Sequence, residues 1–190
     1  DGHVVENPRY LKQSVERLAK SQRVLSRRAR KAKASGRKLS ESKNYQKQRI
    51  KVAKLHRHVA EQRRDFQQKL STEILKTADL IAIEALSVKK MLKQPSLSFS
   101  ISDAGWGEFS KMLRYKCELS GKQFVRVDPK NTTQTCHVCG FISGTGNSAK
   151  LGLNVREWTC PNCHTRLDRD QNAAINVLNR GQQMLSEFAD

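Results

Sequence analysis

The chain reads Cys136-His137-Val138-Cys139 and, after twenty further residues, Cys160-Pro161-Asn162-Cys163. This spacing is typical of two knuckles that place four thiolates around one tetrahedral zinc ion. Because a bound ion can hold a glycine-rich segment that buries little apolar surface, we predict a zinc ribbon over residues 131–167. Four sulfurs complete the coordination shell, so the zinc should be structural rather than catalytic.

The same cysteines have a competing interpretation. A redox-active Cys-x-x-Cys pair forms a disulfide, but two pairs occur here together and without the surroundings of a thioredoxin-like motif. The adjacent His137 and His164 are further possible donors, and we expect neither to be a ligand because the sulfurs suffice. Cys117, the fifth cysteine, is expected to be a small buried apolar residue.

A helix is predicted directly after the ribbon, over residues 168–190. Asp168 suits the N-cap, where a carboxylate accepts hydrogen bonds from the first backbone N–H groups. Asp170 falls in the first turn, where an acid interacts favourably with the helix dipole. Taken alone, this position explains Asp170 without any catalytic role.

Two strands, residues 78–84 and 123–129, are predicted upstream of the ribbon. The first is a nearly continuous apolar run, which is typical of a buried strand, and Glu84 closes it. A carboxylate at this edge of an α/β sheet can face a metal or a substrate, although an ordinary solvent-facing glutamate explains Glu84 better from this feature alone. The polar connection at residues 87–102 contains Pro95 and a serine cluster, so we expect a loop there.

The first third of the chain is predicted to be a basic helical hairpin over residues 9–77. Apolar residues recur at helical spacing in its first helix, and a segment rich in glycine and serine separates it from a second helix with a near-heptad stripe. Such a short polar linker favours an antiparallel arrangement. The stripe of the first helix is expected to comprise Leu11, Val15, Leu18, Gln22 and Leu25. The basic residues expected to contact nucleic acid on its remaining face are Arg17, Arg23, Arg27, Arg28, Arg30, Lys31 and Lys33.

The net charge indicates the class of partner. The chain carries 36 Lys and Arg residues against 18 Asp and Glu residues, and 21 of the basic residues but only 6 of the acidic ones fall within residues 1–70. This excess disfavours a neutral metabolic enzyme and favours RNA or DNA, whose phosphates the hairpin can neutralise with release of counterions. A solvated coiled-coil surface without a ligand is the alternative. No apolar run approaches the roughly 20 residues that a membrane span needs, so no membrane partner is expected.

Four motifs, in this order along the chain, together resemble one known family. They are Ile81-Ala82-Ile83-Glu84-Ala85-Leu86, Gly105-Trp106-Gly107-Glu108-Phe109, Val127-Asp128-Pro129 ahead of Thr135-Cys136-x-x-Cys139-Gly140, and Asp168-Arg169-Asp170-x-Asn172-Ala173-Ala174-x-Asn176. The chain resembles the TnpB (OrfB) family of transposon-encoded, RNA-guided DNA endonucleases. These proteins, long called transposases, are related to the miniature type V CRISPR effectors.

The resemblance implies an α/β fold that is a partial RNase H-like (RuvC) nuclease, with the long basic helical hairpin and an inserted four-cysteine zinc ribbon. It divides the chain into a partial RuvC-like domain at residues 1–130, the ribbon at 131–167 and the last RuvC helix at 168–190. It also implies that Glu84 and Asp170 are catalytic ligands of Mg²⁺, because paired divalent ions held by carboxylates cleave phosphodiesters. DNA and a guide RNA are the implied partners, in the cytoplasm of a prokaryote, associated with the nucleoid.

One part of the family's pattern is missing. Its first catalytic Asp lies in a Gly-Ile-Asp-x-Gly type of strand, upstream of the segment that residues 1–8 resemble. Asp1 and Asp79 are available acids, but nothing in their sequence context supports a replacement role. The chain also begins at Asp1 rather than Met. We therefore expect a fragment that is inactive alone and needs an N-terminal segment, or a separate chain, to complete the RuvC sheet.

Two alternatives to a nuclease remain open. The chain is then either a non-catalytic zinc-ribbon module that binds nucleic acid, including the remnant of a decayed transposase, or a structural subunit whose sheet a separate chain completes. Retention of Glu84 and Asp170 argues mildly against long decay. The reading frame upstream of Asp1 separates these hypotheses, because an uninterrupted frame that encodes the missing Asp favours the nuclease.

Overall fold

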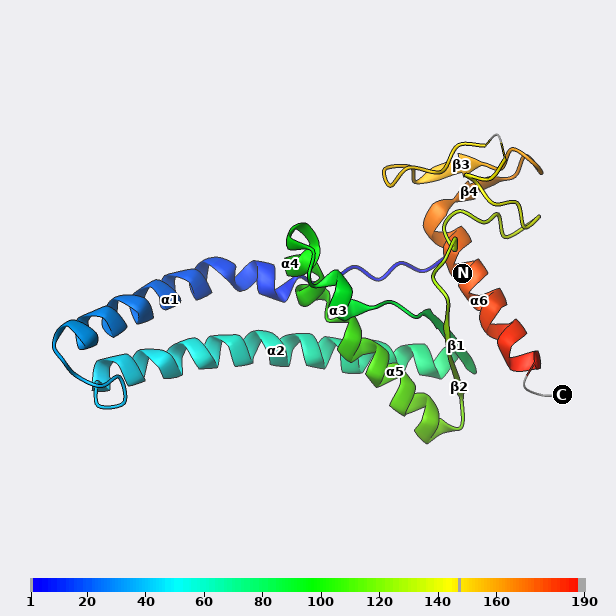
Figure 1. Ribbon diagram of the computed structural model, residues 1–190. Helices are drawn as coiled ribbons and strands as arrows, with labels where there is room; N and C mark the ends of the chain where they lie inside the picture. Colours follow the sequence, from blue (N-terminus) through cyan, green and yellow to red (C-terminus); the bar gives the residue numbers. More distant parts are fainter. Residues whose placement is uncertain (1, 147, 188–190) are drawn as a thin grey trace. The chain divides into compact units, whose positions relative to one another are not determined.

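The computed structural model describes residues 2–146 and 148–187, which form a mixed arrangement of helices and strands (Figure 1). Asp1 and the last three residues of the predicted 168–190 helix lie outside the described part. Contacts divide the chain into two compact units, one of residues 5–72 and 89–109 and the other of residues 1–4, 73–88 and 110–190. No helix among the described residues combines the length and apolar character that a bilayer crossing requires.

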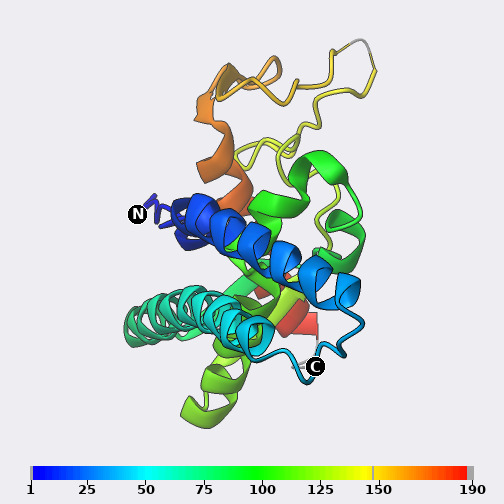
Figure 2. The same cartoon turned by 90° about the vertical axis from the view of Figure 1, so that its left-hand side faces the viewer.

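The first unit is built on two long helices, α1 (Tyr10–Ala34) and α2 (Lys43–Thr77). They run side by side in opposite directions, as Figure 1 shows along their length and Figure 2 from the hairpin end. The rings of Tyr10 and Phe66 meet edge to face at the open end, with 6.4 Å between centroids. Near the other end, Arg28 Nη1 donates to the backbone oxygen of Asn44 at 2.7 Å. The predicted antiparallel hairpin is therefore confirmed.

The seam of the hairpin differs from the predicted stripe. Val15 is 42% exposed and Gln22 is also exposed, whereas Ser21 is half-buried at the seam. There Gln48, which is buried, donates from Nε2 to Ser21 Oγ at 2.8 Å and to the Ser21 backbone oxygen at 3.0 Å. The assignment of Val15 and Gln22 to the stripe was thus wrong, and Ser21 lies at the contact because Gln48 satisfies its polar atoms there.

Residues 87–102 are not the predicted loop. They include α3 (Val88–Met91) and most of α4 (Pro95–Ala104). Pro95 occupies the beginning of α4, where its missing N–H costs no hydrogen bond. The carboxylate of Asp103, only 3% exposed, accepts hydrogen bonds from the backbone nitrogens of Leu11 at 2.8 Å and Lys12 at 3.1 Å. An acid from α4 therefore caps the first turn of α1, a contact between distant residues that local patterns do not reveal.

Replacement of Asp103 by Ala should destabilise this unit by about 1–2 kcal/mol, since two N–H groups at the positive end of α1 lose their acceptor. Urea unfolding followed by circular dichroism measures the change. Ser102→Ala is the matched control, because the neighbouring Ser102 is exposed. Equal midpoints for the two variants would contradict the capping role.

The second unit contains a two-stranded parallel sheet of β1 (Leu80–Glu84) and β2 (Gln123–Val127), in the register Leu80↔Gln123 to Glu84↔Val127. Within the described residues, β1 pairs with no strand other than β2, and of its residues only Ile81 is buried. The expectation of a buried strand is therefore met only at Ile81, and the other four residues of β1 are half-buried. A strand with a single neighbour leaves its other edge uncovered.

Three further elements complete the unit. Helix α5 (Trp106–Ser120) precedes β2, and its last turns carry the fully buried Cys117, as expected. Strands β3 (Glu157–Thr159) and β4 (Arg166–Asp168) form an antiparallel pair. Helix α6 (Arg169–Glu187) follows β4 without a break and runs alongside the parallel sheet (Figure 1).

One face of the parallel sheet packs against α6. Leu80, Ala82, Val125 and Val127 contact the α6 residues Val177, Met184 and Leu185 there. At Gly181 the helix comes so close that a Cβ atom would lie 2.7 Å from Ala82 Cβ. Because α6 can approach β1 this closely only at a glycine, the position of the helix along the strand is fixed.

Candidate metal centre and carboxylate site

The four predicted cysteine ligands come together in one cluster. Their sulfurs all lie within 4.8 Å of one another, with 3.7 Å between Cys136 and Cys163 and 3.6 Å between Cys139 and Cys160. Zn–S bonds of about 2.3 Å in a tetrahedron require sulfur–sulfur distances of about 3.8 Å. All four are free thiols rather than disulfides. The cluster therefore has the geometry to hold a metal ion such as zinc.

Two knuckles and a small core hold these cysteines. In the first knuckle Gly140 N donates to Cys136 O at 2.9 Å, and in the second His164 N donates to Cys160 O at 2.9 Å. Trp158 of β3 and Leu167 of β4 are buried with Cys136 and Cys160. Among the described residues the metal cluster contains cysteines alone, and the Nδ1 of His137 instead faces Asn172 Oδ1 at 3.0 Å.

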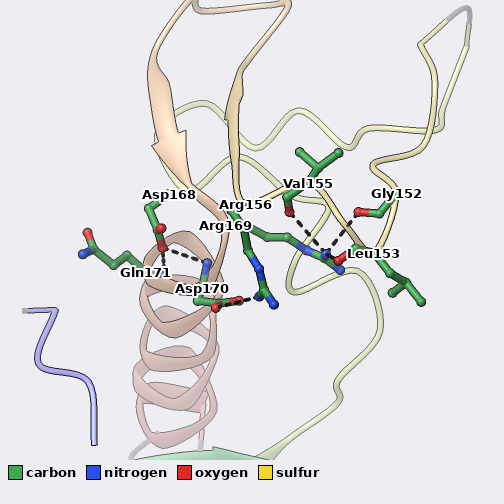
Figure 3. Close-up of polar contacts among 8 residues, drawn as sticks. All are labelled: Gly152, Leu153, Val155, Arg156, Asp168, Arg169, Asp170 and Gln171. Atoms are coloured by element: carbon green, nitrogen blue, oxygen red, sulfur yellow. Dashed lines mark hydrogen bonds and ion pairs between the residues drawn. The ribbon is translucent and has the colours of Figure 1, made fainter. Parts of the chain in front are cut away.

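The ribbon leads directly into the start of α6, where three consecutive side chains have different tasks (Figure 3). Asp168 is the predicted cap, since its Oδ1 accepts from the backbone nitrogens of Asp170 at 3.0 Å and Gln171 at 2.8 Å. Arg169 is 8% exposed, and its Nη1 donates to the backbone oxygens of Gly152, Leu153 and Val155 at 3.0 to 3.4 Å. Arg169 thus ties the ribbon loop to the helix.

Asp170, the third of these residues, is exposed. Its Oδ2 lies 3.3 Å from Arg156 Nη1, and both side chains are 72% exposed (Figure 3). The backbone N–H of Arg169 donates to the Arg156 oxygen at 2.7 Å, which holds Arg156 beside Asp170. An exposed ion pair of this kind contributes at most about 1 kcal/mol, so a divalent cation can displace the arginine.

Glu84 is the last residue of β1 and is half-buried. Its Oε1 accepts a hydrogen bond of 2.5 Å from the hydroxyl of Thr132. Because side chains alternate along a strand, Glu84 points to the same face as Leu80 and Ala82, which is the face that α6 covers.

Asp170 lies on the face of α6 that covers the sheet. Val177 and Gly181 come 7 and 11 residues after it, which at 3.6 residues per turn places each of them within about 20° of Asp170 around the helix axis. From Gly181 the helix extends about 16 Å back to Asp170, while β1 extends only about 7 Å from Ala82 to Glu84. The start of α6, which carries Asp170, therefore lies beyond the end of β1, which carries Glu84.

A buried hydrogen-bond network joins the metal cluster to the end of β1. Asn172 Oδ1 accepts from the backbone nitrogen of His137 at 2.9 Å, and its Nδ2 donates to Thr135 O at 2.7 Å. Asn176 Nδ2 donates to Thr135 O at 2.7 Å and to Thr132 O at 2.9 Å. Since Thr132 in turn holds Glu84, the first knuckle, α6 and the carboxylate share one network. Sequence reasoning did not predict Thr132, although the two asparagines belong to the motif that follows Asp170.

The seven predicted nucleic-acid contacts lie on α1. Six of them are exposed, as a phosphate contact requires. Arg28 is half-buried and its guanidinium is bonded to Asn44 O, so this side chain connects the two helices of the hairpin.

Family models match two parts of the chain. The model described as "Probable transposase" (OrfB_IS605) matches residues 1–94, and the model described as "Cas12f1-like, TNB domain" matches residues 106–177. The solved structure of Cas12f1 in complex with sgRNA and target DNA has a similar fold, with a TM-score of 0.53 at 19% identity over 71% of this chain and 39% of that chain.

Curated relatives align over nearly the whole chain. A protein of Streptomyces pristinaespiralis, named as a candidate RNA-guided DNA endonuclease, is 41% identical over 95% of this chain. Its counterpart InsQ of Escherichia coli K12 is 32% identical over 98%, and the TnpB-like protein L79 of Acanthamoeba polyphaga mimivirus is 31% identical over 74%. The chain spans 41% of the first and 46% of the second, less than half of each. With both family models in the expected order and these relatives aligned across the ribbon and the hairpin, the chain belongs to the TnpB family.

Proposed function

We propose that this chain is part of a transposon-encoded, RNA-guided DNA endonuclease, with Glu84 and Asp170 as two of its catalytic carboxylates. The observation that carries the proposal is that α6 packs on the parallel sheet, with Gly181 against Ala82, while Glu84 ends β1 and Asp170 lies in the first turn of α6. The parallel pair β1 and β2 with α6 on one face then belongs to an RNase H-like (RuvC) domain at residues 1–130 and 168–190, interrupted by the ribbon at 131–167.

Both acids suit divalent-cation chemistry. Glu84 and Asp170 offer the hard oxygen ligands that Mg²⁺ prefers, and Mg²⁺ bound there would supply an activated water and stabilise the leaving oxygen at a phosphate. The Thr132 hydroxyl holds Oε1 of Glu84 and leaves its second oxygen for a cation. Asp170 is paired with the exposed Arg156, and a cation that binds its carboxylate has only this ion pair to displace.

The four-cysteine cluster is proposed to hold structural zinc. Four thiolates fill a tetrahedral shell and leave no position for a reacting water. Its role is to fix the first knuckle, to which Asn172 and Asn176 attach the start of α6. Zinc at this cluster would therefore support the position of Glu84 through Thr132.

DNA and a guide RNA are the proposed partners. The Streptomyces and Escherichia relatives are named for RNA-guided action on DNA, and the hairpin carries the excess of basic residues that phosphate backbones attract. Glu84 and Asp170 are one acid fewer than the family uses. We therefore propose that cleavage requires a further acid, from a segment or chain that pairs with the open edge of the parallel sheet.

Cleavage assays test this proposal. The chain is supplied with the part of the Streptomyces relative that it does not match, a guide RNA, target DNA and Mg²⁺. Glu84→Gln and Asp170→Asn should each lower the rate about 10²- to 10³-fold, since each removes a charge worth several kcal/mol to the bound cation. Asp79→Asn is the control, because that acid is fully exposed and lies at the opposite end of β1.

The chain without the supplied part should not cleave. Robust cleavage by the isolated chain that survives Glu84→Ala would overturn the assignment. Full binding of nucleic acid with no cleavage in any combination would favour a non-catalytic binding module instead.

A further inference from the structure

A groove lies between α1 and α2 in the helical hairpin. It has a volume of about 700 Å³, and its walls carry Arg17 and Lys20 from α1 and Lys51 and Lys54 from α2. The apolar side chains of Val24 and Leu55 also line it. Of the seven basic residues that the sequence indicated, only Arg17 lines this groove, so the cations that converge here come from both helices rather than from the outer face of α1.

These four cations have no acidic partner in the part of the chain that the structure describes. Residues 17–60 contain sixteen Lys and Arg residues and one acid, Glu41. Among the described residues none of Arg17, Lys20, Lys51 and Lys54 forms an ion pair, whereas Arg57 farther along α2 pairs with Glu61. Four like charges around one groove repel each other, and apolar walls concentrate their field in the groove. Such an arrangement is unfavourable in the free protein and favourable when an anion enters.

We propose that this groove binds the phosphodiester backbone of a single nucleic-acid strand. The proposal rests on the proposed nucleic-acid function and specifies where the backbone lies. The α1 wall from Arg17 to Val24 is about 10 Å long, so it accommodates only a short stretch of the backbone of one strand. The groove is far too small for a whole duplex, and its aliphatic walls leave room for sugars between the charged ends of the lysines.

A pair of double variants tests the location. Lys51→Gln with Lys54→Gln removes two charges from the groove, and Lys89→Gln with Lys90→Gln removes two charges from α3, outside it. All four side chains are exposed, so both variants should keep the fold, which circular dichroism checks. Binding of fluorescent 20-mers is measured between 50 and 300 mM salt, in separate arms with single-stranded RNA, single-stranded DNA and duplex DNA.

The groove variant should lose about two phosphate contacts. Its log–log salt slope should become less steep by about 1.4, which corresponds to about 25-fold weaker binding of single strands at 0.1 M salt. The control should change by less than about threefold, because its two exposed lysines do not line the groove and their charges are screened by salt. The arm with the larger loss identifies RNA or DNA as the strand that occupies the groove.

The failures are distinguishable. If both variants lose affinity equally, diffuse charge binds the strand, and the groove proposal is overturned while the nucleic-acid function stands. If the wild-type chain binds no oligonucleotide in any arm, or binds with a flat salt response, the proposed nucleic-acid function itself falls, and the groove with it.

Discussion

Removal of the metal from the four-cysteine cluster should unfold residues 131–167 and detach the start of α6 from the ribbon. The buried core there consists of Trp158, Leu167 and two of the cysteines themselves, with Phe141, Leu151 and Val155 only partly buried against it, which is too little apolar surface to hold the loops without an ion. Structural zinc in small domains contributes about 10–16 kcal/mol of apparent binding free energy, so its loss exceeds what this core can replace. We expect one zinc ion per chain by mass spectrometry, and loss of ribbon signals in NMR spectra after chelation.

Two Cys→Ser substitutions distinguish the effect of losing the metal from the effect of replacing a buried cysteine. Cys160→Ser should abolish stoichiometric zinc and unfold the ribbon. Cys117→Ser changes a cysteine that is equally buried but lies in α5, outside the cluster, and should leave one zinc ion bound. A ribbon that keeps its fold and protease resistance without any metal would rule out the structural role.

The same site should respond to pH. Burial raises the pKa of the Cys136 thiol to about 12, whereas hydrogen bonds from Thr165 lower the pKa of Cys163 to about 6. At pH 7 Cys163 is thus already a thiolate that can bind a metal ion, whereas Cys136 must lose a proton when the metal binds. Because the metal-bound form holds fewer protons than the unfolded chain, its stability decreases as the pH falls. Zinc retention should therefore be weaker at pH 5 than at pH 7.

Local sequence patterns were enough to predict the elements and ligands that each have a signature within a short stretch of the chain. The four cysteines, the Asp168 cap and the two strands follow from patterns within a few residues. Helix α4 was not predicted, because Pro95 and the serines are typical of a loop. The contact that its Asp103 makes joins residues 91 and 92 positions apart, so no local pattern reveals it. Thr132 was also missed, since its bond to Glu84 joins residues 48 apart.

The contact between the two helices of the hairpin also could not be predicted in full from local patterns. Helical periodicity located the helices correctly, but it assigned Val15 to the contact because Val is apolar. The structure places Ser21 there because Gln48 from the other helix satisfies it. Which polar residues face a partner depends on what the partner offers, and a single helix does not contain that information.

Replacement of Asn172 by Ala should cost about 3–5 kcal/mol of unfolding free energy. Asn172 is 1% exposed, and its amide bonds both to His137 N and to Thr135 O. The substitution leaves a buried N–H without an acceptor and removes packed atoms, and these two costs add. Asn179→Ala is the matched control, because it is the same change on an exposed position of α6, and it should cost less than about 0.5 kcal/mol.

A second readout shows whether Asn172 connects the ribbon to α6 or merely fills space. Asn172→Asp keeps an acceptor for His137 N but cannot donate to Thr135 O, so only one half of the connection survives. Its stability should lie between those of the wild type and Asn172→Ala, and zinc affinity should fall in the same order, because His137 adjoins the ligand Cys136. If an apolar side chain of similar size, as in Asn172→Leu, restored stability and zinc affinity together, packing alone would explain this position. The hydrogen bonds of Asn172 would then not be needed to connect the metal cluster with α6 and Glu84.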